Sequence, residues 1–273
     1  MADTPGIPNP PGKTRLVQHF EKSEIEDHNE AWANLWDTNN DDMWDRGRPS
    51  PALIDLIEKD DILNPITAEG RRKKVLVPGC GKGYDVVMLA LHGFDVVGLE
   101  ISSKGISIAE EYSRKEFLDP QTYNSGPSGS SNTGLVGRGS VTFIQGDFFK
   151  GDSLSGEKFD IIYDYTFLCA IHPRMRAQWA TRMADLLITG GLLVCLEFPL
   201  FKDPGAIGPP WPLQGVHWDL LVEGGDGIVY PSTTPEKVPR VGGGGFERLR
   251  YIKPERSYES GRGTDMLSVY VRK

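Results

Sequence analysis

Cysteine is scarce in this sequence: Cys80, Cys169 and Cys195 are the three among 273 residues. An odd count at wide spacing excludes a disulfide framework and a zinc site of ordinary ligand spacing. The five histidines are scattered in the same way, so we expect no bound metal. Unpaired cysteines are typical of a reducing compartment, and we expect the cytoplasm.

Long apolar runs and an excess of positive charge are also missing. No apolar stretch approaches the about 20 residues that cross a bilayer, and the opening "MADTPGIPNPPGKTR" lacks the apolar segment of a secretory signal. A formal net charge of −8, without a Lys/Arg cluster of the usual length, argues against nucleic acid or anionic membranes as partners. Nothing in the pattern demands a dimer, so we expect a monomer that acts on a small molecule.

Two stretches are too polar to build a core. Residues 1–25 contain a Pro-rich start and are expected to form a disordered leader, with residues 26–273 as a single domain. Residues 119–140, "DPQTYNSGPSGSSNTGLVGRGS", are rich in Gly and Ser and are expected to form a flexible surface insertion. The glycine run 242–245 is left without an assignment.

The remaining chain alternates short apolar runs with helical patterns. Expected strands are residues 75–77, 94–99, 141–145, 159–168, 192–200, 246–252 and 266–272. Expected helices are residues 26–37, 51–58, 84–91, 102–115 and 173–188, with glycines 190 and 191 as a stop signal, and a short one near 213–222. This pattern predicts an α/β fold: a Rossmann-like doubly wound, mostly parallel sheet of seven strands with an antiparallel edge.

A glycine loop follows the first strand, in "KKVLVPGCGKGYDVVMLALHGFDVVGLEIS". In an open parallel sheet, ligands bind beyond the carboxyl ends of the strands. Gly79, Gly81 and Gly83 fall there, and glycine lets the main chain approach a ligand closely. Glu100 ends the second strand, where a carboxylate can accept hydrogen bonds from ribose hydroxyls. The two features together predict a nucleoside-containing cofactor.

The details favour S-adenosylmethionine over a dinucleotide. A dinucleotide site uses Gly-x-Gly-x-x-Gly, whereas this loop is Gly-x-Gly-x-Gly with bulky Tyr84 at the place of the last glycine. Asp147 in "GDFF" ends the third strand, and an acid beside the Phe148 ring suits an adenine base. A nicotinamide-dependent oxidoreductase stays as a distant alternative.

The chain resembles the thiopurine S-methyltransferase family, and within it the branch that acts on thiols, thiocyanate and halides. Five segments in family order carry the resemblance: "NEAWANLWDTNNDDMWDRGRPSPAL", "VLVPGCGKGYDVVMLALHGFDVVGLEIS", "GDFF", "FDIIYDYTFLCAIHPRMRAQWATRMADLL" and "LEFPLFKDPGAIGPP". The resemblance implies a class I methyltransferase fold and in-line transfer of a methyl group from S-adenosylmethionine to a small thiol or anion, without a metal. It also implies that residues 26–60 form a helical lid over the cofactor.

The resemblance also assigns site residues. It places the aromatic rings of Trp32, Trp36 and Trp44 in the lid, where they would attract the sulfonium cation and exclude water. The other cofactor positions that match the family are Gly79, Glu100, Asp147, Phe148 and Tyr165, beside Gly81 from the loop pattern. The family carries an acceptor-binding arginine where this chain has Arg176. Many methyltransferases have an acid where this chain has Val77.

Tyr165 and Asp164 at the end of the fourth strand are the further candidates for catalysis. A thiol is only partly ionised at neutral pH, and a nearby hydroxyl or cation could stabilise the thiolate or pass its proton to water. Several alternatives stay open at this point: core packing for the tryptophans, a surface position for Arg176, an aromatic thiol or thiopurine as acceptor, and a non-catalytic protein that only binds S-adenosylmethionine.

Overall fold

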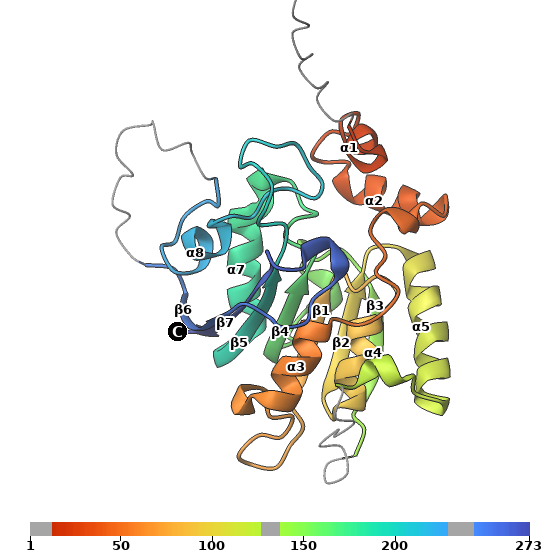
Figure 1. Cartoon of the computed structure of the whole chain (residues 1–273), viewed down its shortest axis with the longest axis vertical. Coiled ribbons are helices and arrows are strands. Elements are labelled where there is room, and N and C mark those ends of the chain that lie inside the picture. The colour runs from red at the N-terminus through yellow and green to blue at the C-terminus, as the bar shows by residue number, and fades with distance from the viewer. Residues whose placement is uncertain (1–12, 127–136, 229–242) are drawn as a thin grey trace, which may run out of the picture.

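A single seven-stranded sheet organises the chain (Figure 1). The computed structural model describes residues 13–126, 137–228 and 243–273. The strands are β1 (Lys74–Pro78), β2 (Asp95–Glu100), β3 (Val141–Gln145), β4 (Phe159–Tyr165), β5 (Leu187–Glu197), β6 (Phe246–Ile252) and β7 (Met266–Arg272). Their order is β3-β2-β1-β4-β5-β7-β6; β1 to β5 are parallel, and β7 runs antiparallel to β5 and β6. The predicted fold class is confirmed.

Helices cover both faces of this sheet (Figure 1). They are α1 (Arg15–Phe20), α2 (His28–Asp37), α3 (Pro51–Lys59), α4 (Tyr84–Leu91), α5 (Ser103–Leu118), α7 (Arg176–Leu186) and α8 (Val216–Leu221). Residues of α3 and α4 share one buried cluster with inward-facing residues of β1 and β4, and residues of α7 and α8 share another. Strands β1, β2 and β4 are buried along almost their whole length, and burial on both faces explains why their sequences are largely apolar. The edge strands β3 and β6 are more exposed.

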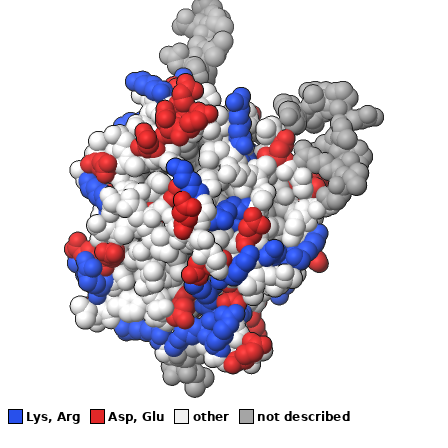
Figure 2. Space-filling view, turned by 180° about the vertical axis from the view of Figure 1, so that it is seen from behind, with Lys and Arg blue, Asp and Glu red and all other residues white. Residues whose placement is uncertain are grey.

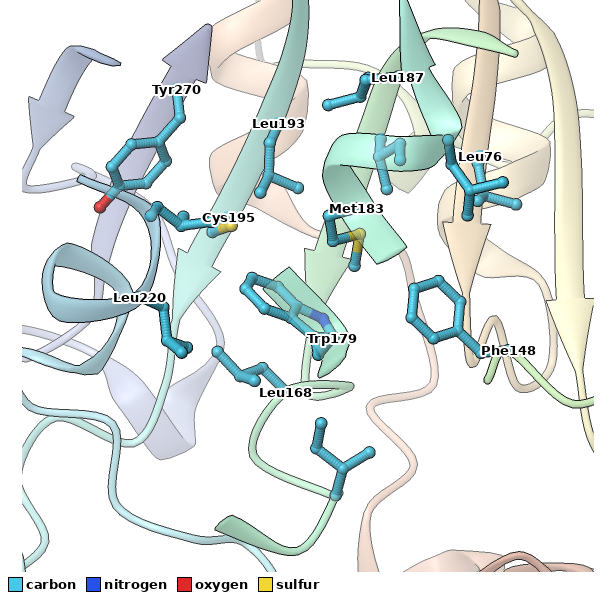
Figure 3. Packing of buried hydrophobic residues seen from close by; sticks show 14 of the residues in the cluster. Leu76, Phe148, Leu168, Trp179, Met183, Leu187, Leu193, Cys195, Leu220 and Tyr270 are labelled. Atoms are coloured by element: carbon cyan, nitrogen blue, oxygen red, sulfur yellow. The ribbon is translucent and has the colours of Figure 1, made fainter. Parts of the chain in front are cut away.

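Trp179 of α7 lies at the centre of the second cluster, with Met183, Leu168 and Cys195 around its ring (Figure 3). Its side chain is fully buried, and large aromatic rings contribute strongly to core packing. The indole N–H is not left without an acceptor, because it donates to the Asp164 carboxylate at 2.9 Å. This side of the sheet is therefore a packed core and not a binding surface.

Several boundaries differ from the sequence prediction, and the following have a clear physical reason. Residues 15–20, expected in a disordered leader, form α1, because Leu16 and Phe20 pack against Ala31 and Leu35 of α2; residues 1–12 lie outside the described ranges. Helix α7 ends at Leu186 and β5 begins at once. Glycines 190 and 191 lie inside β5. Between the pairs Phe159–Leu187 and Ile161–Leu192, four residues of β5 lie opposite one residue of β4, so the glycines belong to an irregular β-bulge.

The Gly- and Ser-rich insertion is structured at its start. Helix α5 runs to Leu118, and the buried Glu116 carboxylate accepts hydrogen bonds from the Gln121 N–H, the Tyr123 hydroxyl and the Asn124 amide. The expectation of flexibility is therefore wrong for residues 121–126. Residues 127–136 lie outside the described ranges.

The carboxyl ends of the strands face α1 and α2 (Figure 1). Strand order reverses between β1 and β4, which have their crossover connections on opposite sides, and such a reversal leaves a crevice beyond the strand ends.

On the opposite view of the molecule, acidic and basic side chains are mixed, with Lys and Arg more frequent toward its lower part (Figure 2). No helix in the described ranges combines the length and the hydrophobicity of a membrane span. Within the same ranges, no group of three or more His, Cys, Asp or Glu side chains is placed to hold a metal ion.

Candidate active site

A pocket occupies this crevice, between the carboxyl ends of the strands and α2 with the segment that follows it. The segment of residues 38–50, which we call the strap, crosses from α2 to α3 (Figure 1). The predicted residues that line the pocket are Trp32, Trp36, Trp44, Gly79, Gly81, Glu100, Asp147, Phe148 and Tyr165. All nine candidate cofactor residues are thus brought together, although they come from segments far apart in the sequence.

The glycine loop forms the floor of the pocket. Gly79, Gly81 and Gly83 have φ values of 59°, 54° and 76°. Residues other than glycine rarely adopt this backbone conformation. A Cβ added at Gly79 would lie 2.5 Å from the Phe167 ring, whereas one at Gly81 would lie 3.6 Å from Trp36. Close approach and backbone conformation therefore both require glycine at position 79.

The Glu100 carboxylate is held by the backbone around it. Its Oε2 accepts from the Gly81 N–H at 3.1 Å, and its Oε1 accepts from the N–H groups of Ile101 and Ser102 at 2.9 and 3.1 Å. The side chain is 6% exposed; burial raises the pKa of this carboxyl group, while the three N–H groups counteract that rise. A carboxylate has about four acceptor positions, so one remains on Oε2 for a hydroxyl of a bound ribose.

Asp147 connects the end of β3 to helix α2. Its Oδ1 accepts from the Phe149 N–H at 2.8 Å, and its Oδ2 accepts from the Asn29 amide at 2.7 Å. Phe148 beside it is 4% exposed and packs edge-to-face on Phe167, with ring centroids 5.1 Å apart. This end of the pocket offers carboxylate and amide groups next to aromatic faces, which suits the amine and ring of an adenine.

Aromatic rings close the pocket from the side of α2. Trp44 packs edge-to-face on both Trp32 and Trp36, with centroids 5.2 and 5.4 Å apart, and Trp32 contacts Phe20 of α1 at 4.7 Å. Trp36 is 3% exposed. A Cβ added at Gly105 would lie 3.5 Å from its ring, so the ring packs closely against α5. The alternative of plain core packing therefore describes part of the role of these rings, but each ring also lines the pocket.

The strap is fastened to the glycine loop by charge. The Lys82 ammonium contacts Asp41 Oδ2 at 2.7 Å and Asp45 Oδ2 at 2.5 Å, and these three side chains are about one-fifth exposed. Tyr84 adds a weaker hydroxyl contact to Asp45 at 3.4 Å. Lys82 lies between two glycines of the loop. The ion pairs with Asp41 and Asp45 therefore connect the position of the strap to the position of the glycine loop.

Tyr165 lies where the strap passes over the end of β4. Its hydroxyl accepts from Arg46 Nε at 3.2 Å, and its ring stacks on Tyr258 with centroids 4.9 Å apart. Burial raises the pKa of Tyr165 well above its usual range, and Arg46 only partly counteracts the rise. Tyr165 is therefore protonated at neutral pH, and its hydroxyl is available as a hydrogen-bond donor and not as a base.

Asp164 does not face the pocket, contrary to the prediction. Successive side chains of a strand point to opposite faces of the sheet, so Tyr163 and Tyr165 line the pocket while Asp164 points toward α7. Its carboxylate accepts from Trp179 Nε1 at 2.9 Å and from the Leu168 N–H at 3.2 Å. Asp164 thus fixes the turn after β4, a structural role.

Arg176 also lies away from the pocket lining. Its guanidinium donates to the carbonyl oxygens of Gly227 and Pro212 at 2.7 and 2.8 Å, and the side chain is 4% exposed. Burial lowers the pKa of Arg176 to about 10. Neither the predicted acceptor contact nor the alternative of a surface arginine holds, because the charge is used to anchor the loops after β5 and α8.

Sequence reasoning missed several residues of the pocket. Asn29, Arg46 and Lys82 gain their roles only through contacts across the chain, and the one signal for Arg46 was its position two residues after Trp44. Thr166 also lines the pocket and has a φ of 61°, which is uncommon for a β-branched residue and is typical of strained functional sites.

The residues present fit a nucleoside cofactor with a positive centre. One acceptor position on Glu100 is available to a ribose, polar groups at Asp147 suit an adenine, and indole rings face the space between. Aromatic faces attract a cation that has no hydrogen-bond donors. Val77 also lines the pocket. Because many methyltransferases have an acid at this position, the pocket wall is apolar here where theirs is charged.

Comparison with known proteins identifies relatives. The family model described as thiopurine S-methyltransferase (TPMT) matches residues 27–224. Probable thiol methyltransferase 2 of Arabidopsis thaliana is 36% identical over 203 residues, which cover 74% of this chain and 76% of that protein. Thiocyanate methyltransferase 1 of Brassica oleracea is 35% identical over 193 residues, 70% of this chain and 71% of that protein. Thiopurine S-methyltransferase of Pseudomonas fluorescens (strain SBW25) is 32% identical over 167 residues, which cover 55% of this chain and 68% of that protein.

A solved structure shares the architecture. Magnesium protoporphyrin IX methyltransferase from Synechocystis PCC 6803, with bound SAH, superposes with a TM-score of 0.51 at 15% sequence identity, covering 90% of this chain and 100% of that chain. At this identity the likeness shows the fold alone, which is that of the class I methyltransferases.

Proposed function

The chain belongs to the thiopurine S-methyltransferase family, and on that premise we propose that it transfers the methyl group of S-adenosylmethionine to a small thiol, thiocyanate or halide. The observation that carries the proposal is the buried Glu100 carboxylate, which the backbone holds at the end of β2 with one acceptor position open to an aromatic pocket. Relatives named for thiols and thiocyanate support the acceptor class.

Several residues would hold the cofactor. Glu100 would accept from a ribose hydroxyl, Asp147 and Asn29 would contact the adenine amine, and Phe148 would pack on the base. The rings of Trp36 and Trp44 would lie next to the sulfonium and keep water out, which strengthens electrostatic attraction inside the pocket. These positions are filled by side chains that the fold already holds in place, so little ordering is required on binding.

The chemistry is an in-line displacement. When bound, S-adenosylmethionine supplies a methyl group already activated by the positive sulfur: the acceptor's electron pair forms the new bond to carbon as the methyl–sulfonium bond breaks, leaving S-adenosylhomocysteine. The protein contributes alignment and the exclusion of water. The Tyr165 hydroxyl would donate a hydrogen bond to the acceptor and keep its proton, and a thiol acceptor would lose its own proton to water before attack.

We also propose that the chain works as a monomer in the cytoplasm, without nucleic acid or membrane as partners. The pocket lining comes from α2, the strap and the strand ends of a single chain, which supports a complete site in one copy. Light scattering during gel filtration should give the mass of one chain, 30.2 kDa, and twice that mass would contradict the proposal.

The activity is tested with methyl-labelled S-adenosylmethionine and a panel of acceptors. Thiocyanate, iodide, hydrosulfide, a small alkyl thiol and an aromatic thiol should be compared at equal concentration. The proposal expects labelled product from thiocyanate, iodide or hydrosulfide at rates well above that from the aromatic thiol. Preferential turnover of the aromatic thiol would favour a thiopurine-type enzyme. No labelled product with any acceptor, while the protein still binds S-adenosylhomocysteine, would favour a binding protein.

A further inference from the structure

Two cationic side chains of the strap, Arg46 and Arg48, line the pocket, and Arg48 is the more exposed of the two. Arg46 is half-buried and lines the pocket. Its Nε donates to the Tyr165 hydroxyl at 3.2 Å, and its Cζ lies 5.4 Å from the centre of the Phe198 ring. No carboxylate among the described residues forms an ion pair with it, so the guanidinium charge is not neutralised there.

The surroundings of Arg46 are aromatic and poor in acceptors. Tyr165 stacks on Tyr258, and Phe198 packs on Tyr165 with centroids 6.1 Å apart. The Tyr165 oxygen already accepts from Arg46, and no acceptor for its own proton is found in the described parts of the chain. The hydroxyl and the guanidinium belong to neighbouring side chains of the pocket lining and both have N–H or O–H groups available to donate.

The acidic groups near this space already have partners. Asp45 and Asp85 line the pocket, where Asp45 pairs with Lys82 and Asp85 accepts from the Ser50 N–H. Asp164 points to the other face of the sheet, where Trp179 occupies it. Burial raises the pKa of Asp265, and the charge of Arg46 partly counteracts that rise. Asp265 is 1% exposed, and its Oδ2 accepts from the Ser257 hydroxyl at 2.5 Å. This part of the pocket has a positive charge, a hydroxyl donor and aromatic walls. It can therefore attract an anion and replace the water molecules that a large, weakly hydrated anion loses on binding.

We propose that Arg46, together with the Tyr165 hydroxyl, binds the methyl acceptor as an anion, and that Arg46 sets the preference for thiolate, thiocyanate or halide. This inference rests on the methyl transfer proposed above. Arg46 holds the anion by charge-assisted hydrogen bonds, and it lowers the free energy of a thiolate relative to its thiol. The Lys82 bridge to Asp45 keeps the neighbouring residue fixed, so the guanidinium stays in position when the acceptor enters.

The test is Arg46→Gln with thiocyanate and iodide, which are anions at every accessible pH. At saturating S-adenosylmethionine, KM for both anions should rise about 30- to 100-fold, the range for losing a charged hydrogen-bonding partner. The Kd for S-adenosylhomocysteine should stay within about twofold. Arg46→Lys should restore part of the loss, because it keeps the charge without the planar fork. Arg114→Gln on the exposed face of α5 is the matched control.

A binding measurement separates this inference from the proposed function. Thiocyanate should raise the melting temperature of the wild-type complex with S-adenosylhomocysteine, and should not raise that of Arg46→Gln. That result supports the anion site even if wild-type protein methylates nothing. An equal rise in both proteins, or an unchanged KM for thiocyanate in Arg46→Gln, would overturn the inference. A loss confined to kcat, with KM unchanged, would also overturn it, since it would assign Arg46 to holding Tyr165 alone.

Discussion

At the scale of single residues, the alternation of side chains along β4 decides which groups can meet the acceptor. Tyr163 and Tyr165 share the pocket face, and Asp164 takes the other. The period of two in a strand is visible in the sequence, so the opposite orientations of neighbours 164 and 165 could have been predicted. The fixed contacts of Arg176 could not, because they depend on where the loops of Pro212 and Gly227 pass.

Glu100 is the residue on which cofactor binding depends. Glu100→Gln keeps the volume and one oxygen acceptor, but the amide nitrogen cannot accept from the Gly81 N–H or from a ribose hydroxyl. We expect the affinity for S-adenosylhomocysteine to fall about 50-fold or more, as for a lost hydrogen bond to a charged group. Isothermal titration calorimetry measures this directly.

Glu111→Gln is the control for that substitution, since Glu111 is exposed on α5 and pairs with Lys115 of the same helix. It should leave the affinity unchanged. An unchanged affinity in Glu100→Gln would show that the carboxylate does not contact the nucleoside.

At the scale of elements, the strap and its neighbours are the part that sequence reasoning described least well. Apolar periodicity and turn residues predicted the strands, α4, α5 and the glycine loop, because those signals are local. Helix α1 has six residues, too few for a clear period, and is stabilised by packing on α2. The bridge from Lys82 to Asp41 and Asp45 joins residues about 40 positions apart, and no local pattern encodes such a contact.

Removing the bridge should loosen the strap. Lys82→Met leaves Asp41 and Asp45 unpaired and close together, so their repulsion favours an open strap. We expect backbone amides of residues 41–48 to exchange with solvent about tenfold faster, and the affinity for S-adenosylhomocysteine to fall a few-fold. Hydrogen exchange followed by mass spectrometry measures the first effect.

Lys115→Met, which removes an exposed pair with Glu111 on α5, serves as the comparison and should change neither quantity. Unaltered exchange in the strap of Lys82→Met would mean that other contacts hold it.

The junction of α3 and α4 should give the protein a dependence on pH. Asp85 Oδ1 accepts from the Ser50 N–H at 2.7 Å, yet burial raises the pKa of Asp85 to about 7, from about 3.9 in an unfolded chain. Between these values the folded protein keeps a proton that the unfolded chain has lost. The contribution of Asp85 to the free energy of unfolding therefore falls as pH rises from about 4 to about 7.

Asp85→Asn keeps the acceptor oxygen and cannot ionise. Its stability relative to wild type should grow across that window, by on the order of 2 kcal/mol after allowance for partial exposure, and level off above about pH 7. Thermal unfolding of both proteins at pH 5, 6, 7 and 8 measures the difference. A difference that is constant over this range would mean that Asp85 is ionised in the fold at every pH tested.

At the scale of the whole molecule, the order of the strands brings the parts of the site together. The reversal between β1 and β4 opens a crevice at the strand ends, and α2 with the strap covers it (Figure 1). The sequence predicted this arrangement because each buried parallel strand is a continuous apolar run. It did not predict which polar groups the cover would carry, and Arg46 and Asn29 come from there.

A crystal structure of the chain with S-adenosylhomocysteine tests the central claim most directly. We expect Glu100 Oε2 within hydrogen-bond distance of a ribose hydroxyl, the adenine beside Phe148 and Asp147, and the sulfur next to the rings of Trp36 and Trp44. Density for the nucleoside at any other place, or a Glu100 carboxylate that makes no contact with it, would contradict the account.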